Sequence, residues 1–232
     1  FGLESPLLRL NGRVYKNLLV IAELYRQQKN MYDQRSHKVA DRIVSISQPH
    51  VRPIVRGKAN ADVEFGAKIS VAMVDGYAFL EKLSWDAFNE AGELKDHIEN
   101  YHRRFGYYPA SVHVDEIYRN RENRNYCKRR GIQISGPPLG RPPKDPAEYR
   151  RLLKGAKQSE IERIPIEGKF GNGKRKYGWL RITSKLMNTS ETSIAMTVLV
   201  MNLEKISRDL LLSIFSLLRR LEFFLRGGQK FA

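Results

Sequence analysis

The pattern of apolar and polar positions divides the chain into helical and extended stretches. Apolar residues three and four positions apart, as over residues 17–30 and 90–105, predict amphipathic helices. Further helices are expected over residues 118–130, over 147–174 with a break or kink near Pro165, and over 192–225. Strict alternation over residues 63–71 has a period of two and predicts a strand, and Asp75-Gly76 then turns the chain into a return strand ending near Trp85.

Three shorter apolar runs predict additional strands, at residues 42–47, 111–114 and 132–135. The last two flank the helix predicted over residues 118–130, and a strand, helix, strand order implies parallel pairing. Functional groups of open α/β sheets collect beyond the carboxyl ends of the strands. Asp115 directly follows the strand at residues 111–114 and is therefore expected at such a position.

Length and composition fit an α/β protein with a substantial core. The 232 residues are 41% hydrophobic, enough for one large domain or for a domain with an appendage. We expect a helical lead-in over residues 1–40, a core over 41–190 and a C-terminal helix with its tail over 191–232. The last helix is interpreted as a core helix, whose end at residues 217–224 could contact a partner.

The net charge of +16 points to a polyanionic partner, most often nucleic acid. The charge is concentrated, because residues 119–154 hold eleven Lys or Arg against three Asp or Glu. A solvated basic surface without a partner is the alternative. Proline and glycine interrupt residues 48–60 and 136–146, which are interpreted as basic irregular segments, either linkers or loops that contact phosphate.

Cysteine content and hydropathy limit the kinds of stabilising site and the cellular compartment that fit this sequence. Cys127 is the single cysteine, so an intrachain disulfide and a cysteine-rich zinc site are excluded, and a reducing compartment fits. A packed thiol is favoured over a nucleophile at this position. No apolar run reaches about 18 residues, so no membrane span is expected.

Two carboxylates separated by basic residues indicate the chemistry. Asp115 ends a strand, and Glu167 follows 52 residues later in a predicted helix. Carboxylates are hard ligands for divalent ions and cations hold a phosphate backbone, a combination typical of metal-dependent cleavage of phosphodiesters. The alternatives are a helix N-cap for Asp115 and a surface ion pair with Lys169 or Arg163 for Glu167.

These residues resemble the DDE-type transposases of bacterial insertion sequences. Val112-His113-Val114-Asp115, followed by a basic helix, is similar to the element that carries the second aspartate of that family. Arg163, Glu167 and Lys174 match three positions of a Tyr, Arg, Glu, Lys pattern at its spacing, whereas Glu160 replaces the tyrosine. The likeness extends over residues 18–202.

The resemblance implies a ribonuclease-H-like mixed sheet flanked by helices, in which two aspartates and a glutamate bind two Mg²⁺ or Mn²⁺ ions. Asp115 and Glu167 would be two of the three ligands. The first aspartate is expected on a strand upstream of the hairpin, and the candidates Asp33, Asp41 and Asp62 do not end a convincing buried strand. We therefore expect the core to be incomplete at its N-terminus.

The implied activity is hydrolysis at the ends of an insertion sequence, followed by strand transfer into target DNA. The implied partners are duplex DNA, as terminal inverted repeats and target, and a second copy on that DNA, in the bacterial cytoplasm at the nucleoid. The expected DNA contacts are Arg163, Lys174, Arg121, Arg124, Arg141 and Lys144. Competing hypotheses are an inactive DNA-binding remnant of a transposase and a basic structural RNA-binding protein.

Overall fold

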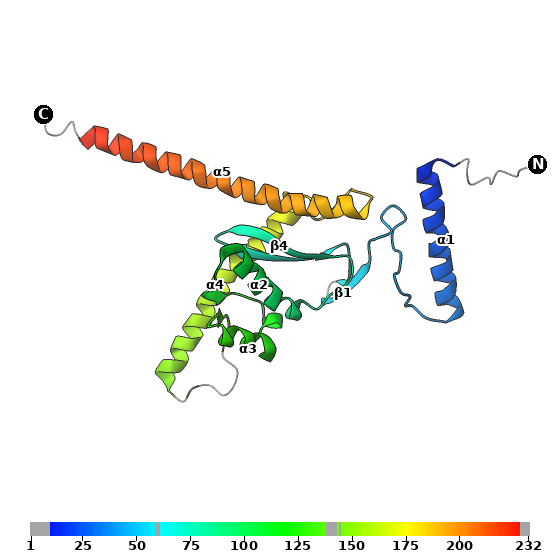
Figure 1. Cartoon of the computed structure of the whole chain (residues 1–232), viewed down its shortest axis with the longest axis horizontal. Helices are drawn as coiled ribbons and strands as arrows, with labels where there is room; N and C mark the ends of the chain where they lie inside the picture. The colour runs from blue at the N-terminus through cyan, green and yellow to red at the C-terminus, as the bar shows by residue number, and fades with distance from the viewer. Residues whose placement is uncertain (1–9, 59–60, 138–142, 144, 228–232) are drawn as a thin grey trace, which may run out of the picture. The chain divides into compact units, whose positions relative to one another are not determined.

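The computed structural model describes residues 10–58, 61–137, 143 and 145–227, and it confirms the mixed α/β class (Figure 1). The helices are α1 (Gly12–Asp33), α2 (Leu94–Phe105), α3 (Arg121–Arg129), α4 (Pro146–Arg175) and α5 (Met187–Gly227). Two short 3₁₀ helices are η2 (Glu90–Gly92) and η3 (Glu116–Tyr118). The strands are β1 (Pro53–Lys58), β2 (Ala61–Phe65), β3 (Lys68–Val74), β4 (Tyr77–Ser84), β5 (Ser111–Val112) and β6 (Gln133–Ile134).

The described strands form three two-stranded sheets, β1-β2, β3-β4 and β5-β6. The chain divides into two compact units. The first comprises residues up to Ser70, with Lys82–Asn89 and Thr183–Thr192, and the second comprises Val71–Glu81, Glu90–Ile182 and residues from Ser193 onward. Within the part of the chain that the structure describes, no helix has both the length and the apolar character needed to cross a membrane.

The predicted hairpin is confirmed at its turn and wrong at its first strand. Asp75 and Gly76 have φ of 51° and 80°, the left-handed pair that a tight hairpin turn requires. Residues 63–71 are not one strand, because Gly66 has a φ of 137°, which L-residues rarely adopt, and separates β2 from β3. β2 pairs instead with β1, antiparallel, with Pro53 opposite Phe65.

Two predictions on the N-terminal side are wrong. Residues 42–47 are irregular, because the buried Gln27 of α1 binds this segment by donating to the carbonyl of Asp41 (3.2 Å) and accepting from the N–H of Ile43 (2.9 Å). A side chain thus takes the hydrogen bonds that a neighbouring strand would provide. The basic loop predicted over residues 48–60 contains β1, which tolerates Pro53 because proline occupies its first residue.

The strand, helix, strand unit is confirmed as predicted. β5 and β6 are parallel, with Ser111 opposite Gln133 and Val112 opposite Ile134, and α3 lies between them in sequence. α3 packs against α2 in a shared hydrophobic core, to which Cys127 contributes a fully buried side chain. Burial raises the pKa of the Cys127 thiol, as expected for a packed residue. The core residues are Leu94, Ile98, Tyr126, Cys127 and Ile132.

Two predictions on the long C-terminal helices are corrected, one on the continuity of α4 and one on the burial of α5. α4 is one continuous helix, so the break predicted near Pro165 is absent (Figure 1). α5 is buried at Ile194, Val198 and Met201, and the side-chain amide of Asn202 both donates to and accepts from the backbone of Ala78, at 2.8 Å each. The core role predicted for residues 192–225 therefore holds only for the first part of this helix.

Candidate functional site

Asp115 lies just beyond the carboxyl end of β5. The preceding residue, Val114, is fixed by hydrogen bonds from its N–H to the Ser135 hydroxyl (2.9 Å) and from the Arg119 guanidinium to its carbonyl (2.9 Å). The Oδ1 atom of Asp115 accepts from the N–H of Glu116 (2.8 Å) and caps η3. The N-cap alternative is thus confirmed as one role of Asp115, but 63% of the side chain remains exposed and accessible to a ligand.

Arg163 brings the two predicted carboxylates together. Its Nη1 lies 3.3 Å from Asp115 Oδ1, and its Nη2 lies 3.2 Å from Glu167 Oε1. Arg163 and Glu167 are one turn apart on α4, so the arginine reaches from the helix to the end of β5 while it also pairs along the helix. Its side chain is only 28% exposed, whereas that of Glu167 is 60% exposed.

A second contact, which the sequence did not suggest, holds α4 beside β5. The Nε2 atom of His113 lies 3.0 Å from Glu162 Oε2 and 3.0 Å from the Ser111 hydroxyl. His113 and Asp115 lie two residues apart, and their partners Glu162 and Arg163 are consecutive. The sequence carries no local signal for this contact, because it depends on how α4 lies against β5. These contacts give His113 a packing role beside β5.

The donor set matches part of a divalent-ion site. Asp115 and Glu167 offer carboxylate oxygens on either side of one cationic group, and such oxygens are the ligands that Mg²⁺ and Mn²⁺ prefer. Among the described residues, no group of three or more His, Cys, Asp or Glu could by itself hold a metal ion. The arrangement therefore supplies two carboxylates that share one guanidinium.

The predicted DNA-contacting residues differ in exposure. Arg121, at the start of α3, and Lys174, in the last turn of α4, are exposed. Arg124 is half-buried and donates to the carbonyl of Arg119 (3.0 Å), and burial, then the charge of Arg119, lowers its pKa. Arg141 and Lys144 lie outside the described residues.

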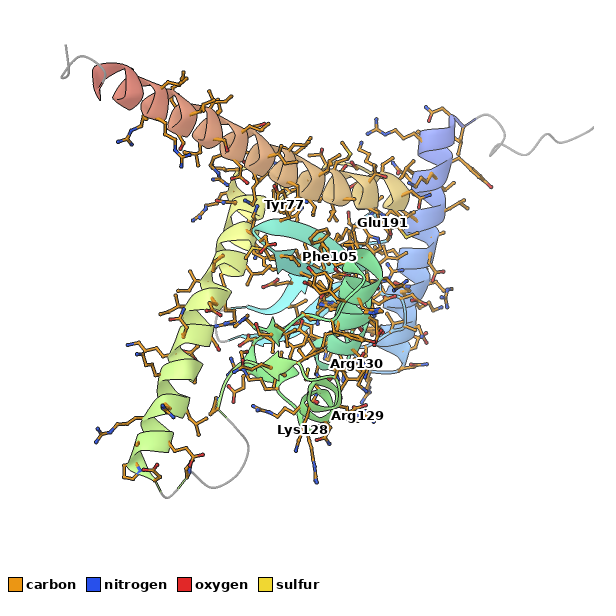
Figure 2. The ribbon with its side chains drawn as sticks, turned by 60° about the vertical axis from the view of Figure 1, so that its left-hand side comes forward. Tyr77, Phe105, Lys128, Arg129, Arg130 and Glu191 are labelled. Atoms are coloured by element: carbon orange, nitrogen blue, oxygen red, sulfur yellow. The ribbon has the colours of Figure 1, made fainter. Side chains whose placement is uncertain are left out.

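The second unit carries additional basic residues on α3 and α4. Lys128, Arg129 and Arg130 end α3 together (Figure 2). Of the two ion pairs considered for Glu167, with Lys169 or with Arg163, the structure shows the one with Arg163. Burial and the nearby charges of Arg208 and Lys205 on α5 lower the pKa of Lys169.

A hydrogen-bonded cluster around the carboxylate of Glu99 joins α2 to α3 in the unit that carries Asp115. Glu99 of α2 accepts hydrogen bonds from the hydroxyls of Tyr126 and Tyr108 and from Arg130 at 2.9 Å. The hydrogen bond from Tyr126, then the charge of Arg130, holds the pKa of Glu99 below its ordinary value. The guanidinium of Arg130 also lies 3.9 Å from the centre of the Tyr126 ring, so α2 and α3 are joined by one polar network.

Comparison with known families matches residues 112–204 to a model described as the transposase DDE domain. The match starts in β5, includes Asp115, Arg163, Glu167 and Lys174, and ends within α5. It confirms the family resemblance over this range. Comparisons with curated proteins and with solved structures gave no match.

Proposed function

Because residues 112–204 match a model described as the transposase DDE domain, we propose that the chain acts in DNA transposition through the site at Asp115 and Glu167. The proposed reaction is phosphodiester hydrolysis at the ends of an insertion sequence, followed by attack of the freed 3′-hydroxyl on target DNA. The observation that supports this proposal is the double contact of Arg163, which places both carboxylates next to one cationic group.

The fold that we propose for the core is the ribonuclease-H-like mixed sheet of the family. The parallel β5-β6 pair with α3 between the strands supports it, because a carboxylate beyond the end of a parallel strand is a usual position for a functional group. The continuous α4 supports it as well, since one helix carries both Glu167 and Lys174, about two turns apart.

Asp115 and Glu167 are the proposed ligands of Mg²⁺ or Mn²⁺, with two ions in the complete site. A bound pair of ions would stabilise the charge that develops on the attacking and leaving oxygens. The chain's own contribution is to present the carboxylates from two different elements. Arg163 keeps them together and shields their mutual repulsion, and a divalent ion would compete with its guanidinium for the same oxygens.

Duplex DNA is the proposed substrate, as terminal inverted repeats and as target, with two copies of the chain on the DNA and a location at the bacterial nucleoid. The net charge of +16 supports a polyanionic substrate. Exposed Lys174 and Arg121 would contact the backbone, and Arg163 would do so once released from the carboxylates.

The test is cleavage of DNA that carries both flanks of the coding region, with Mg²⁺ or Mn²⁺ and the full chain. Asp115→Asn and Glu167→Gln should abolish cutting, whereas Glu148→Gln, an exposed carboxylate in the first turn of α4, should leave it unchanged. Calorimetric titration with Mn²⁺ gives a readout independent of cutting, and both site variants should weaken it at least tenfold. Unchanged cutting in both site variants would refute the proposal.

A second candidate function is an inactive DNA-binding remnant of a transposase. It is favoured by the finding that no three-ligand group occurs among the residues the structure describes. The remnant predicts DNA binding that falls steeply with salt and is insensitive to Asp115→Asn, with no cutting under any metal. Cutting and metal binding that both depend on Asp115 exclude it.

A further inference from the structure

The C-terminal part of α5 exposes a regular apolar face. Within the second unit the packed stripe of α5 consists of Ile194, Val198 and Met201, followed by Asn202 and its bonds to Ala78. The helix continues to Gly227 well beyond these contacts, as one uninterrupted element (Figure 1). Two residues along a helix correspond to a rotation of about 200°, so positions that begin at Met196 lie opposite the packed stripe.

From Met196 to Leu221 this opposite face follows a heptad repeat. Large apolar residues recur at alternating steps of four and three, the spacing of a coiled-coil seam. The side chains are exposed by 43–59%. The positions that correspond to d are Met196, Leu203, Leu210 and Leu217. The positions that correspond to a are Val200, Ser207, Ile214 and Leu221, of which Ser207 is the polar exception.

We propose that this seam, defined by these eight residues, binds the same seam of a second copy in a parallel, two-stranded coiled coil. The residue types identify the occupant, because β-branched Val200 and Ile214 at a, with leucine at most d positions, favour two parallel strands. A polar residue at an a position fixes register. Parallel, in-register pairing places the two Ser207 hydroxyls opposite each other, where each can bond to the other instead of facing leucine.

The length and the area of the seam suit a dimer. Residues 196–221 cover between three and four heptads, about the length at which a sustained repeat indicates a coiled coil. An interface of standard size buries about 800 Å² per partner, and the exposed side chains of the seam and of the apolar residues beside it can supply such a surface. The flanking side chains that add to this area are Leu199, Ile206, Leu211 and Leu218.

The proposed contact is independent of DNA, which separates it from the pairing of two copies on a DNA substrate. Each copy carries a net charge of +16, so two copies repel at low ionic strength. Salt screens this repulsion and does not weaken apolar burial. Association through the seam should therefore persist or tighten as salt rises, whereas copies joined only through DNA should separate.

The experiment measures the mass of the nuclease-treated full chain by sedimentation velocity at about 1 M NaCl, where the Debye length is about 3 Å. The expected result is a dimer, twice the chain mass of 26.9 kDa. Leu210→Glu should weaken dimerisation at least a hundredfold and give the monomer at the same concentration. A monomeric wild-type chain overturns the proposal, and a trimer or tetramer overturns its two-stranded form.

Leu212→Glu is the matched control, because Leu212 lies two residues away and outside the seam, with 62% exposure against 59% for Leu210. This variant should remain dimeric. Both substitutions are at exposed positions, and unchanged circular dichroism of each variant will show that the fold is retained. Equal loss of dimer in both variants would mean that general helix hydrophobicity, not the seam, drives association.

Orientation is tested by disulfide formation. Ser207→Cys should crosslink two copies under mild oxidation, because parallel in-register chains bring the two thiols together. Ser216→Cys, an exposed serine on the outer side of the same helix, should not. The native Cys127 does not interfere, since its side chain is fully buried. A dimer that fails to crosslink through residue 207 refutes parallel register.

Discussion

The guanidinium of Arg163 lies 3.3 Å from the carboxylate of Asp115, although 48 positions separate the two residues in the chain. Arg163 thereby connects α4 to the end of β5 at the point where both proposed ligands meet. The same side chain has a buried Nε without a hydrogen-bond partner among the described residues. The two Nη atoms thus make the ion-pair contacts of the group, and a divalent ion would compete with them directly.

Replacing Arg163 by alanine is expected to tighten Mn²⁺ binding about two- to fivefold, the equivalent of one partly exposed ion pair. The variant leaves two carboxylates without their shared cation, which favours a divalent ion. Arg163→Lys should give an intermediate affinity, because lysine retains the charge but cannot contact both carboxylates in a fork. Calorimetric titration with Mn²⁺ measures this, and weaker binding in the alanine variant would show that positioning by Arg163 outweighs its competition.

The Glu99 cluster predicts loss of stability in acid. The folded-state pKa of Glu99 lies below its ordinary value of 4.5. Its contribution is therefore fully present above the unfolded-state pKa and is lost as the pH falls through the folded-state pKa. Thermal unfolding midpoints from about pH 6 to pH 3 should fall more steeply for the native chain than for Glu99→Gln. A control variant, Glu148→Gln, should follow the native curve, and identical slopes in all three proteins would contradict the prediction.

Near the end of α4, Gly173 packs against the ring of Trp179, which leaves no room for a larger side chain at position 173. A Cβ at Gly173 would press on Cε3 of Trp179 and lie 2.6 Å from its Cζ3, and the N–H of Trp179 donates to the Gly173 carbonyl (3.0 Å). Gly173→Ala should destabilise the protein by about 1–3 kcal/mol. Denaturant unfolding compares it with Gly155→Ala on the same helix, where no atom lies within 4 Å of the added Cβ. That control should be neutral or stabilising by up to about 1 kcal/mol.

Because Asn202 makes two hydrogen bonds to the backbone of Ala78, removing its side chain should lower the free energy of unfolding more than removal of a typical polar side chain does. Ala78 is buried, so removal of the amide leaves a buried N–H and carbonyl without this partner. Asn202→Ala should cost about 1–3 kcal/mol of unfolding free energy. Asn125→Ala, at an exposed position of α3, serves as the comparison and should change stability by less than about 0.5 kcal/mol. Similar losses in the two variants would argue against the pairing.

The sequence predicted those features that depend on local chemistry. Asp75-Gly76 defines a turn by its own backbone preferences, and the spacing of Arg163, Glu167 and Lys174 fixes their positions along one helix. The parallel unit around α3 followed from the order of its elements. Asp115 was therefore found at the end of its strand, with both of the roles considered for it compatible with its contacts.

Other features required knowledge of packing between distant segments. The irregular segment at residues 42–47 is held by Gln27, whose position on α1 gives no local signal. The pairing of His113 with Glu162 likewise depends on how α4 lies against β5. In α5, periodicity identified an apolar helix but not which faces are covered, because a packed stripe and a coiled-coil seam have the same spacing in sequence.

The proline within α4 also affects where that helix bends most easily. Pro165 lies between Arg163 and Glu167 and has no N–H, so the helix lacks the hydrogen bond to the carbonyl of Ile161, in the turn that carries Arg163 and ends just before Glu167. A helix with a missing rung has lower bending stiffness at that turn. Bending of α4 is therefore least resisted beside the carboxylates, and a small bend there changes the spacing of the charged groups without unfolding the helix.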